Sequence, residues 1–161
     1  MSTDKETDSL WRFIRRSVDR ILICLDGLDE TDLNWRPLDN ANSLYVLATH
    51  TIGNVEANIL GVLCLQNIHR QRENEFKAHG SSSEPIQKRW REVQESISSH
   101  LAKLSSNDLD KEYTHPRRGK IIGRELLITI ARHIAEHVGH AELTRDLLFS
   151  VRGRALPEKE F

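Results

Sequence analysis

Apolar residues recur at intervals of three and four positions in four long stretches of the chain. These stretches cover residues 4–26, 43–66, 84–105 and 121–151. Such spacing keeps one face of an α-helix apolar, because the helix completes a turn about every 3.6 residues. No stretch shows a convincing alternation of apolar and polar residues, or the turn of a β-hairpin. The pattern therefore predicts an all-α protein with four long amphipathic helices.

Single residues near the ends of these stretches indicate where the helices begin and stop. Gly27 follows the first stretch, and a glycine in the left-handed conformation commonly ends a helix. Either Asn42 or Ser43 can cap the second helix through its side-chain oxygen. Pro85 suits the first turn of the third helix, where its missing N–H would be unpaired in any case. These signals agree with the boundaries that the apolar spacing predicts.

Long polar connections join the second predicted helix to the third and the third to the fourth. They cover residues 67–83 and 106–120. Of the 161 residues, 38% are hydrophobic and 29% are charged, which is enough apolar material to bury a core without disulfides. We therefore expect one domain over residues 1–161, folded as a four-helix bundle with long inter-helix loops.

The net charge and the hydropathy of the chain indicate which partners and which cellular compartment to expect. The net charge of −1 lacks the positive surplus that binding to a phosphate backbone requires. No apolar run approaches the roughly 18 residues that could span a bilayer, and the first segment, MSTDKETDSL, is polar and acidic. Cys24 and Cys64 each lie within an apolar helical pattern, as buried free thiols do. We expect a cytoplasmic protein that has neither nucleic acid nor membrane as a partner.

Three of the eight histidines fall within residues 133–140, which have the sequence HIAEHVGH. With Ile130 at the centre of the apolar stripe of the fourth helix, His137 lies inside the stripe. His133 lies at its edge, about 60° from the centre, and His140 lies further out at about 80°. A buried imidazole needs a polar partner, because an unpaired buried polar group costs about 1–3 kcal/mol. Something polar must therefore meet His137.

The second helix offers that partner in His50. The face around His50 carries small residues, among them Gly53 and Gly61, so it leaves either a hollow or an unusually close helix contact. Asn54 lies one turn after His50 on the same face and is a candidate contact to a ligand or to a substrate. Two alternatives remain at this stage: His50 is a hydrogen-bonded core histidine, and the spacing of His133 and His137 arises by chance.

Two longer motifs carry a family resemblance. They are Trp35-Arg36-Pro37 with Ser43 and His50, and the run HVGHAELTRD that begins at His137. Together they resemble the DinB-like superfamily (DinB/YfiT-type metal-binding four-helix bundles), which includes thiol-dependent maleylpyruvate isomerases and bacillithiol transferases. The resemblance spans the chain from the loop before the second helix through the fourth helix.

The resemblance implies a metal site and a thiol chemistry. It places a divalent ion, zinc or nickel, on His50, His133 and His137, with His140 outside the ligand set. Gly139 also matches the family pattern and would let a neighbouring helix approach closely. Three neutral imidazoles leave a position open for water or substrate, as catalytic sites do. The cofactors implied are therefore a divalent metal and a low-molecular-weight thiol.

Three functions are compatible with these residues. The first is a metal-dependent thiol S-transferase or isomerase-like enzyme acting on a small molecule, for which the sequence designates no catalytic side chain. The second is a non-catalytic metal-binding or stress-associated helical bundle, and the third is a structural helical dimer whose histidines hold nothing. Monomer and homodimer both remain open. We expect Trp35 and Pro37 to pack at the mouth of the histidine pocket, the alternative being that Trp35 caps the end of the bundle.

Overall fold

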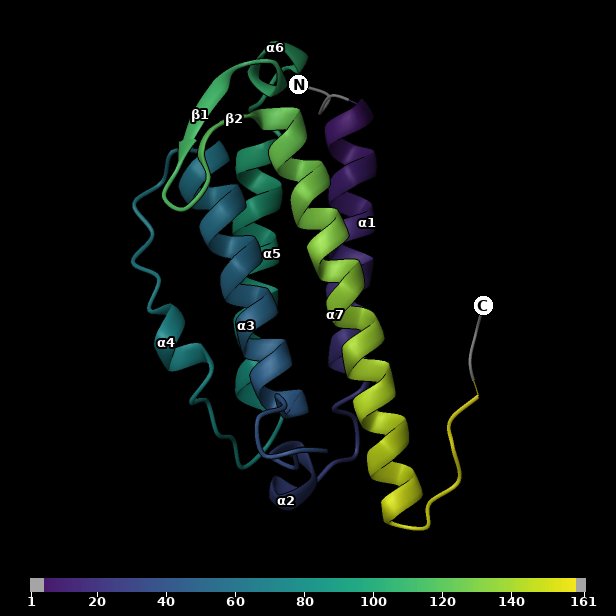
Figure 1. Cartoon of the computed structure of the whole chain (residues 1–161). Helices are drawn as coiled ribbons and strands as arrows, with labels where there is room; N and C mark the ends of the chain where they lie inside the picture. Colours follow the sequence, from purple (N-terminus) through teal and green to yellow (C-terminus); the bar gives the residue numbers. More distant parts are fainter. Residues whose placement is uncertain (1–4, 159–161) are drawn as a thin grey trace.

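Four long helices lie side by side in the computed structural model, which describes residues 5–158 (Figure 1). The all-α prediction is confirmed. The helices are α1 (Lys5–Ile23), α3 (Leu44–Glu56), α5 (Glu84–Leu101) and α7 (Gly123–Val151). The chain continues from α3 directly into a π-helical segment, η1 (Ala57–Leu63), so the second predicted helix changes its winding halfway. Segments of this kind often occur at functional sites.

The ends of the helices lie close to the predicted ones. The predicted start at Asp4 lies outside the described residues, and α1 ends three residues earlier than predicted. Residues 24–26 continue as a tighter turn, in which the Cys24 N–H donates to the Ile21 carbonyl at 3.1 Å. Gly27 then adopts a φ of 70°, the left-handed conformation expected after a helix.

Two predicted helix starts are confirmed by their local geometry. Ser43, not Asn42, caps α3: its backbone is extended, and its hydroxyl accepts a hydrogen bond from the Val46 N–H at 3.2 Å. Pro85 lies in the first turn of α5. The first turn of a helix leaves backbone N–H donors unpaired. Ser43 satisfies one of them, and Pro85 has no N–H to satisfy.

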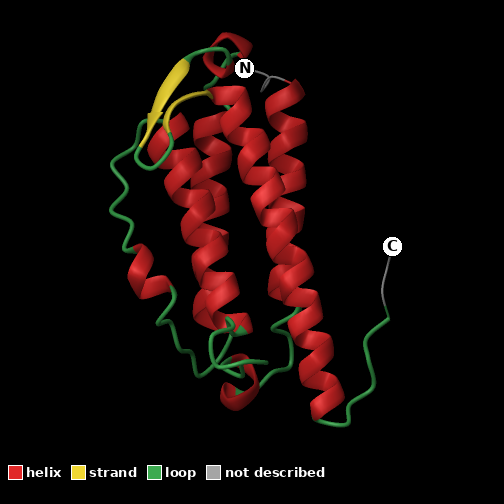
Figure 2. Cartoon of the chain, in the orientation of Figure 1, coloured by secondary structure: helices red, strands yellow, loops and turns green. Residues whose placement is uncertain are grey.

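The connection predicted over residues 106–120 is more ordered than expected. It holds the short helix α6 (Ser106–Leu109) and a two-stranded antiparallel hairpin of β1 (Glu112–His115) and β2 (Gly119–Ile122) (Figure 2). Tyr113 pairs with Ile121, and both side chains are buried, which anchors the hairpin on the helices. The strands are too short for their alternation to stand out in the sequence.

One hydrophobic core joins the four long helices. Trp11 of α1 and Trp90 of α5 meet edge to face, with ring centroids 6.1 Å apart. Both indoles are also held by hydrogen bonds: Trp11 donates to Ser98 Oγ at 3.0 Å, and Trp90 donates to Asp19 Oδ1 at 2.7 Å. Cys24 is buried as predicted, whereas Cys64 is only half-buried; both are free thiols.

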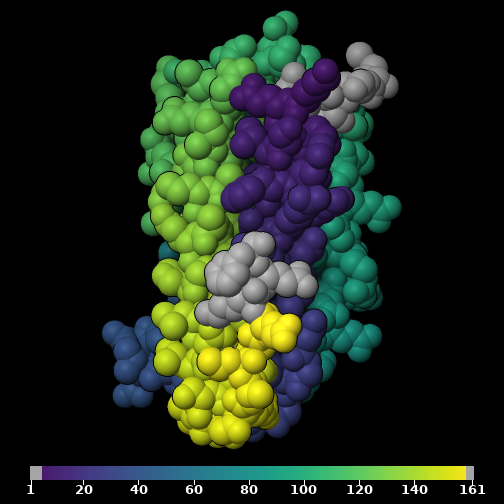
Figure 3. Space-filling model, turned by 90° about the vertical axis from the view of Figure 1, so that its right-hand side faces the viewer, coloured from purple at the N-terminus to yellow at the C-terminus, as the bar shows by residue number. Residues whose placement is uncertain are grey.

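Helices α1 and α7 lie against each other along one face of the molecule (Figure 3). Arg20 of α1 and Glu142 of α7 form an ion pair across this contact at 2.6 Å. The expected close helix approach at Gly139 is wrong: among residues 5–158, no other segment lies within 4 Å of the position that a Cβ would take there, because Gly139 is exposed. Within residues 5–158, no helix combines the length and apolarity needed to cross a membrane.

Candidate metal centre and adjoining cavity

Three histidine rings converge between α3 and α7. His50 comes from α3, and His133 and His137 lie one turn apart on α7. One ring nitrogen of each lies within 4.8 Å of the other two. The ring centroids are 5.9 Å apart for His50 and His133, 5.2 Å for His50 and His137, and 4.4 Å for His133 and His137. The convergence predicted from the sequence is therefore present.

A buried carboxylate orients His50. Glu75, at the end of α4 (Arg72–Glu75), accepts a hydrogen bond from His50 Nδ1 at 2.9 Å. Arg70 donates to both oxygens of the same carboxylate at 2.7 Å. Burial alone would raise the pKa of Glu75, but the hydrogen bonds from Arg70 and His50 outweigh burial and lower it to about 2. The ionised carboxylate holds the proton of His50 on Nδ1, so that Nε2 keeps a free lone pair.

Gly53 makes room for this carboxylate. A Cβ at Gly53 would lie 2.2 Å from Glu75 Oε1, far closer than two such atoms approach. The small-residue face around His50 is thus filled here by the Glu75 side chain, which comes from the short helix α4 within the polar connection and not from one of the four long helices. The sequence left open either a hollow or a close helix contact at this face, and it carried no signal that Glu75 approaches His50.

His133 and His137 face each other through their Nε2 atoms at hydrogen-bond distance. Their Nε2 atoms are 3.1 Å apart, and the buried Nδ1 of His137 has no hydrogen-bond partner among residues 5–158. Burial, then the neighbouring His133 and His50, lower the pKa of His137 to about 3. Burial and then His50 also lower the pKa of His133. Both rings are therefore neutral near pH 7.

These observations fit a divalent cation. One ring nitrogen of each histidine points to the same small space, where a cation could replace the proton shared between His133 and His137 at 3.1 Å. Neutral imidazoles that cannot readily gain a proton retain the lone pairs that zinc or nickel accepts. His140 is exposed, and although its ring centroid lies 5.7 Å from that of His137, it is not one of the three converging residues.

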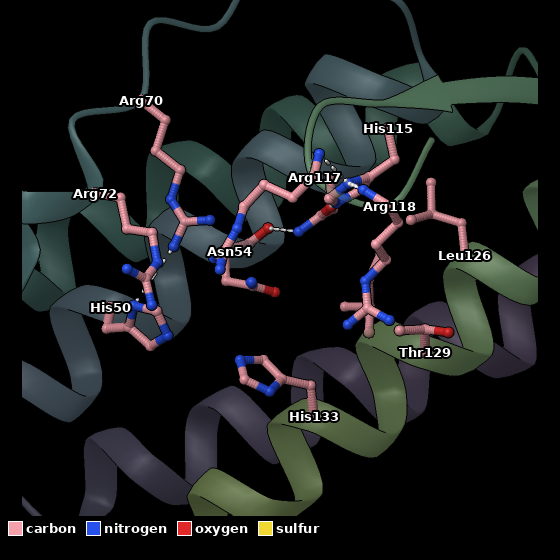
Figure 4. A pocket seen from close by; sticks show the side chains of 12 residues that line it. His50, Asn54, Arg70, Arg72, His115, Arg117, Arg118, Leu126, Thr129 and His133 are labelled. Carbon is pink, nitrogen blue, oxygen red and sulfur yellow. Dashed lines mark hydrogen bonds between the residues drawn. The ribbon is translucent and has the colours of Figure 1, made fainter. Parts of the chain in front are cut away.

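A cavity of about 260 Å³ opens beside His50 and His133 (Figure 4). Asn54, the predicted contact residue, lines it one turn along from His50. On the far side, the cavity is bordered by the tip of the hairpin and by the connection that carries α4. A position left open on an ion held by the three histidines can thus face a space large enough for a small molecule.

His115 also lines this cavity, and sequence reasoning assigned it no role. Its Nε2 lies 2.8 Å from Asn58 Oδ1 in η1, and its Nδ1 accepts hydrogen bonds from the backbone N–H groups of Arg117 and Arg118 at 3.0 and 3.1 Å. The signal that could have located this turn is the segment His-Pro-Arg-Arg-Gly: proline favours the start of a turn, and Gly119 adopts a φ of 73°.

The expectation that Trp35 and Pro37 form the wall of the histidine pocket requires correction. Both line a separate, mostly apolar groove, which His140 and Leu47 also border. The reason is the direction of α3. The loop that holds Trp35 lies at the end where α3 begins, whereas the cavity extends from His50 along α3 in the opposite direction, toward Asn54.

Comparison with known families now adds to this geometry. Residues 9–149 match the family described as "Mycothiol-S-transferase". The chain belongs to this family. No curated protein matches it significantly.

Solved structures share the fold of this mycothiol-S-transferase family member at low sequence identity. A conserved protein from Enterococcus faecalis is 15% identical, with a TM-score of 0.74 over 93% of this chain and 99% of that one. A DinB-like protein from Bacillus cereus is 17% identical, with a TM-score of 0.70 over 99% and 100%. Another from Bacillus subtilis is 16% identical, with a TM-score of 0.56 over 96% and 97%. The resemblance to DinB-like proteins is confirmed.

Proposed function

We propose that this protein is a divalent-metal-dependent thiol S-transferase, in which His50, His133 and His137 hold a zinc or nickel ion. The observation that carries the proposal is the convergence of three imidazoles, two of them with lowered pKa values, at the wall of a cavity. Membership in the mycothiol-S-transferase family supplies the reaction class, so mycothiol is the first thiol to test. We also infer that residues 1–161 form one domain, which the shared core of the long helices supports.

A divalent ion held by three neutral imidazoles lowers the pKa of a bound thiol and so favours the nucleophilic thiolate near neutral pH. The protein's own groups prepare the site for this role. Glu75 fixes the orientation and tautomer of His50, and Arg70 keeps Glu75 ionised. Asn54 is placed to contact a substrate within the cavity.

The cavity wall includes no aspartate or glutamate that could act as a general base. His115 is also occupied, because both of its ring nitrogens are engaged in hydrogen bonds. We therefore assign no side-chain base, and the proposal places the activation of the thiol on the histidine site.

The test begins with metal content. Protein freed of metal with a chelator is reloaded with zinc or nickel, and the bound metal per chain is measured. The consumption of mycothiol in the presence of an alkyl halide is then followed. We expect one metal per chain, and turnover only in the loaded protein. His137→Ala should lose both, whereas the control variant His140→Ala should keep both.

Two outcomes would contradict parts of this proposal. One metal per chain in His137→Ala would show that the ligand set is wrong. Tight metal binding without turnover of any thiol, with bacillithiol and glutathione included in the screen, would instead favour the non-catalytic metal-binding protein that the sequence left open.

A further inference from the structure

Four arginines border the cavity beside the histidines. Arg117 and Arg118 reach it from the tip of the hairpin, and Arg70 and Arg72 reach it from the connection that carries α4 (Figure 4). The residues that line the cavity include no aspartate or glutamate to balance these charges. A divalent ion on the histidines would add further positive charge. The residues that line the cavity are therefore basic and not acidic, although the net charge of the chain is −1.

The four guanidinium groups differ in how they are paired. Arg70 is neutralised by the buried Glu75. Arg72 lies 3.5 Å from the exposed Glu73, and its guanidinium carbon lies 4.7 Å from the centre of the Phe76 ring. For Arg117 and Arg118, the structure gives no ion pair or side-chain hydrogen bond with any of residues 5–158. These two are the groups that remain available to a ligand.

The turn that carries Arg117 and Arg118 is held against the helices. Because His115 Nδ1 accepts two backbone N–H groups, it carries no proton, and Nε2 is the nitrogen that donates to Asn58 Oδ1. Asn58 is buried, and its amide donates to the Asn54 carbonyl at 2.8 Å. The backbone from which both arginines extend is thus anchored to α3 and η1.

The positive charge of these arginines lowers the pKa values of histidines that line the cavity. Burial, then Arg118 and Arg117, lower the pKa of His115. Arg118 also contributes to the lowered pKa of His133, after burial, His50 and Arg132. An exposed arginine is ordinarily a solvated surface group. Here two unpaired guanidinium groups from an anchored turn face a cavity without acidic residues, which favours binding of an anion.

We propose that this cavity binds an acidic small molecule, whose carboxylate or phosphate group is held by Arg117 and Arg118 while its reactive end lies toward His50 and His133. The planar guanidinium presents two parallel N–H groups, which match the oxygens of either anion. The inference rests on the proposed function in one respect: the acidic molecule is one of the two reactants of the thiol transfer. The arginines add the requirement that this reactant carries negative charge.

The test uses the full-length chain freed of metal, so that an anion cannot bind by coordinating an ion. Succinate and inorganic phosphate are titrated separately by calorimetry, with the neutral succinamide as a control ligand. We expect one or both anions to bind, more weakly as salt is added, and succinamide not to bind. The preferred anion then distinguishes a carboxylate ligand from a phosphate ligand.

Variants locate the anion. The double variant Arg117→Gln/Arg118→Gln should weaken anion binding about tenfold or more, because both unpaired charges are lost. Arg91→Gln removes an exposed arginine of α5 outside the cavity and should leave binding unchanged. All three substitutions affect exposed side chains, and melting curves check that both variants remain folded.

Three results would overturn the proposal: no binding of either anion, equal weakening in Arg91→Gln, or binding of succinamide as tight as that of succinate. Metal content, measured on the same double variant, should stay at the wild-type value. If metal binds and neither anion does, the anion site is wrong while the metal-dependent function stands. If an anion binds and no metal does, the metal-dependent function is wrong while the anion site stands.

Discussion

His50 Nδ1 donates a hydrogen bond to Glu75 Oε2 at 2.9 Å, although the two residues are 25 positions apart in the chain. The pair links the candidate metal centre to the polar connection outside the four packed helices. Carboxylates in this position fix the tautomer of a histidine ligand and raise its basicity. The connection after η1 is therefore part of the site and not merely a link between helices.

Removing the charge of Glu75 tests this relationship. Glu75→Gln keeps the shape but loses the anionic acceptor, so we expect metal affinity to fall about 10–100-fold. Competition with a chelating dye at constant pH measures the change. Glu92→Gln, an exposed site on α5, is the matched control. Equal affinity in Glu75→Gln and wild-type protein would show that the carboxylate does not support the ligand.

Two glycine substitutions should have opposite effects. Gly53→Ala places a Cβ 2.2 Å from Glu75 Oε1, and Arg70 and His50 hold that carboxylate in place, so we expect a loss of about 1–3 kcal/mol in the free energy of unfolding. Gly139→Ala meets no other segment of residues 5–158 within 4 Å and lies within α7, where alanine should add about 0.5–1 kcal/mol. Urea denaturation of the metal-free proteins measures both changes. A stable Gly53→Ala with unaltered metal affinity would contradict the packing described for Glu75.

The stability of the metal-free protein should fall as the pH is lowered from about 6.5 to 5. In the folded state the pKa of His137 is about 3, so this ring stays neutral. In the unfolded state its pKa is near 6.5, so only the unfolded state gains a proton in this range. The contribution can reach about 1.4 kcal/mol per pH unit. The window ends at pH 5 because Glu75, with its folded pKa of about 2, adds its own loss of stability at lower pH.

Comparison of variants assigns this dependence to His137. Urea denaturation at pH 7, 6 and 5 should give a shallower decline for His137→Gln than for wild-type protein. His69→Gln, which changes an exposed histidine, should retain the wild-type slope. Parallel slopes for all three proteins would count against a buried neutral His137.

The hydrogen bond between His115 and Asn58 should stabilise the hairpin. His115→Ala leaves the buried Asn58 amide oxygen without its donor, at a cost of about 1–3 kcal/mol. It also frees the N–H groups of Arg117 and Arg118, whose hydrogen exchange should become faster. Thr114→Ala, at the neighbouring exposed position of β1, is the control. Unchanged exchange at both arginines would show that His115 does not anchor the turn.

The helices and the histidine cluster were predictable because each is a local pattern. The apolar spacing of α1, α3, α5 and α7 repeats over many turns, and His133 and His137 are one turn apart on the same helix face. His50 could be joined to them because its own helix showed an unusual face of small residues. Periodicity and spacing therefore made His50 a candidate partner of His133 and His137, and the family resemblance completed the set of three.

The surroundings of the histidines depend on contacts that no local pattern encodes. Glu75 lies in a polar connection among several other charged residues, and nothing in its neighbourhood indicates which carboxylate turns inward. The strands of the hairpin are four residues long, so their alternation could not be separated from chance. The loop at Trp35 was misplaced because proximity in sequence to α3 does not determine which way the cavity extends from His50.

The cavity wall is formed partly by the long helices and partly by the hairpin, so the hairpin part can change while the histidine part stays the same. The candidate ligands are built into α3 and α7, where a change of residue disturbs the core, but the loop between β1 and β2 is only residues 116–118 and is exposed. If Arg117 and Arg118 hold an acidic ligand as proposed, exchanging this tripeptide would redirect the protein toward neutral or cationic compounds while its histidines stay in place. A library limited to these three codons would sample selectivity with little risk to folding.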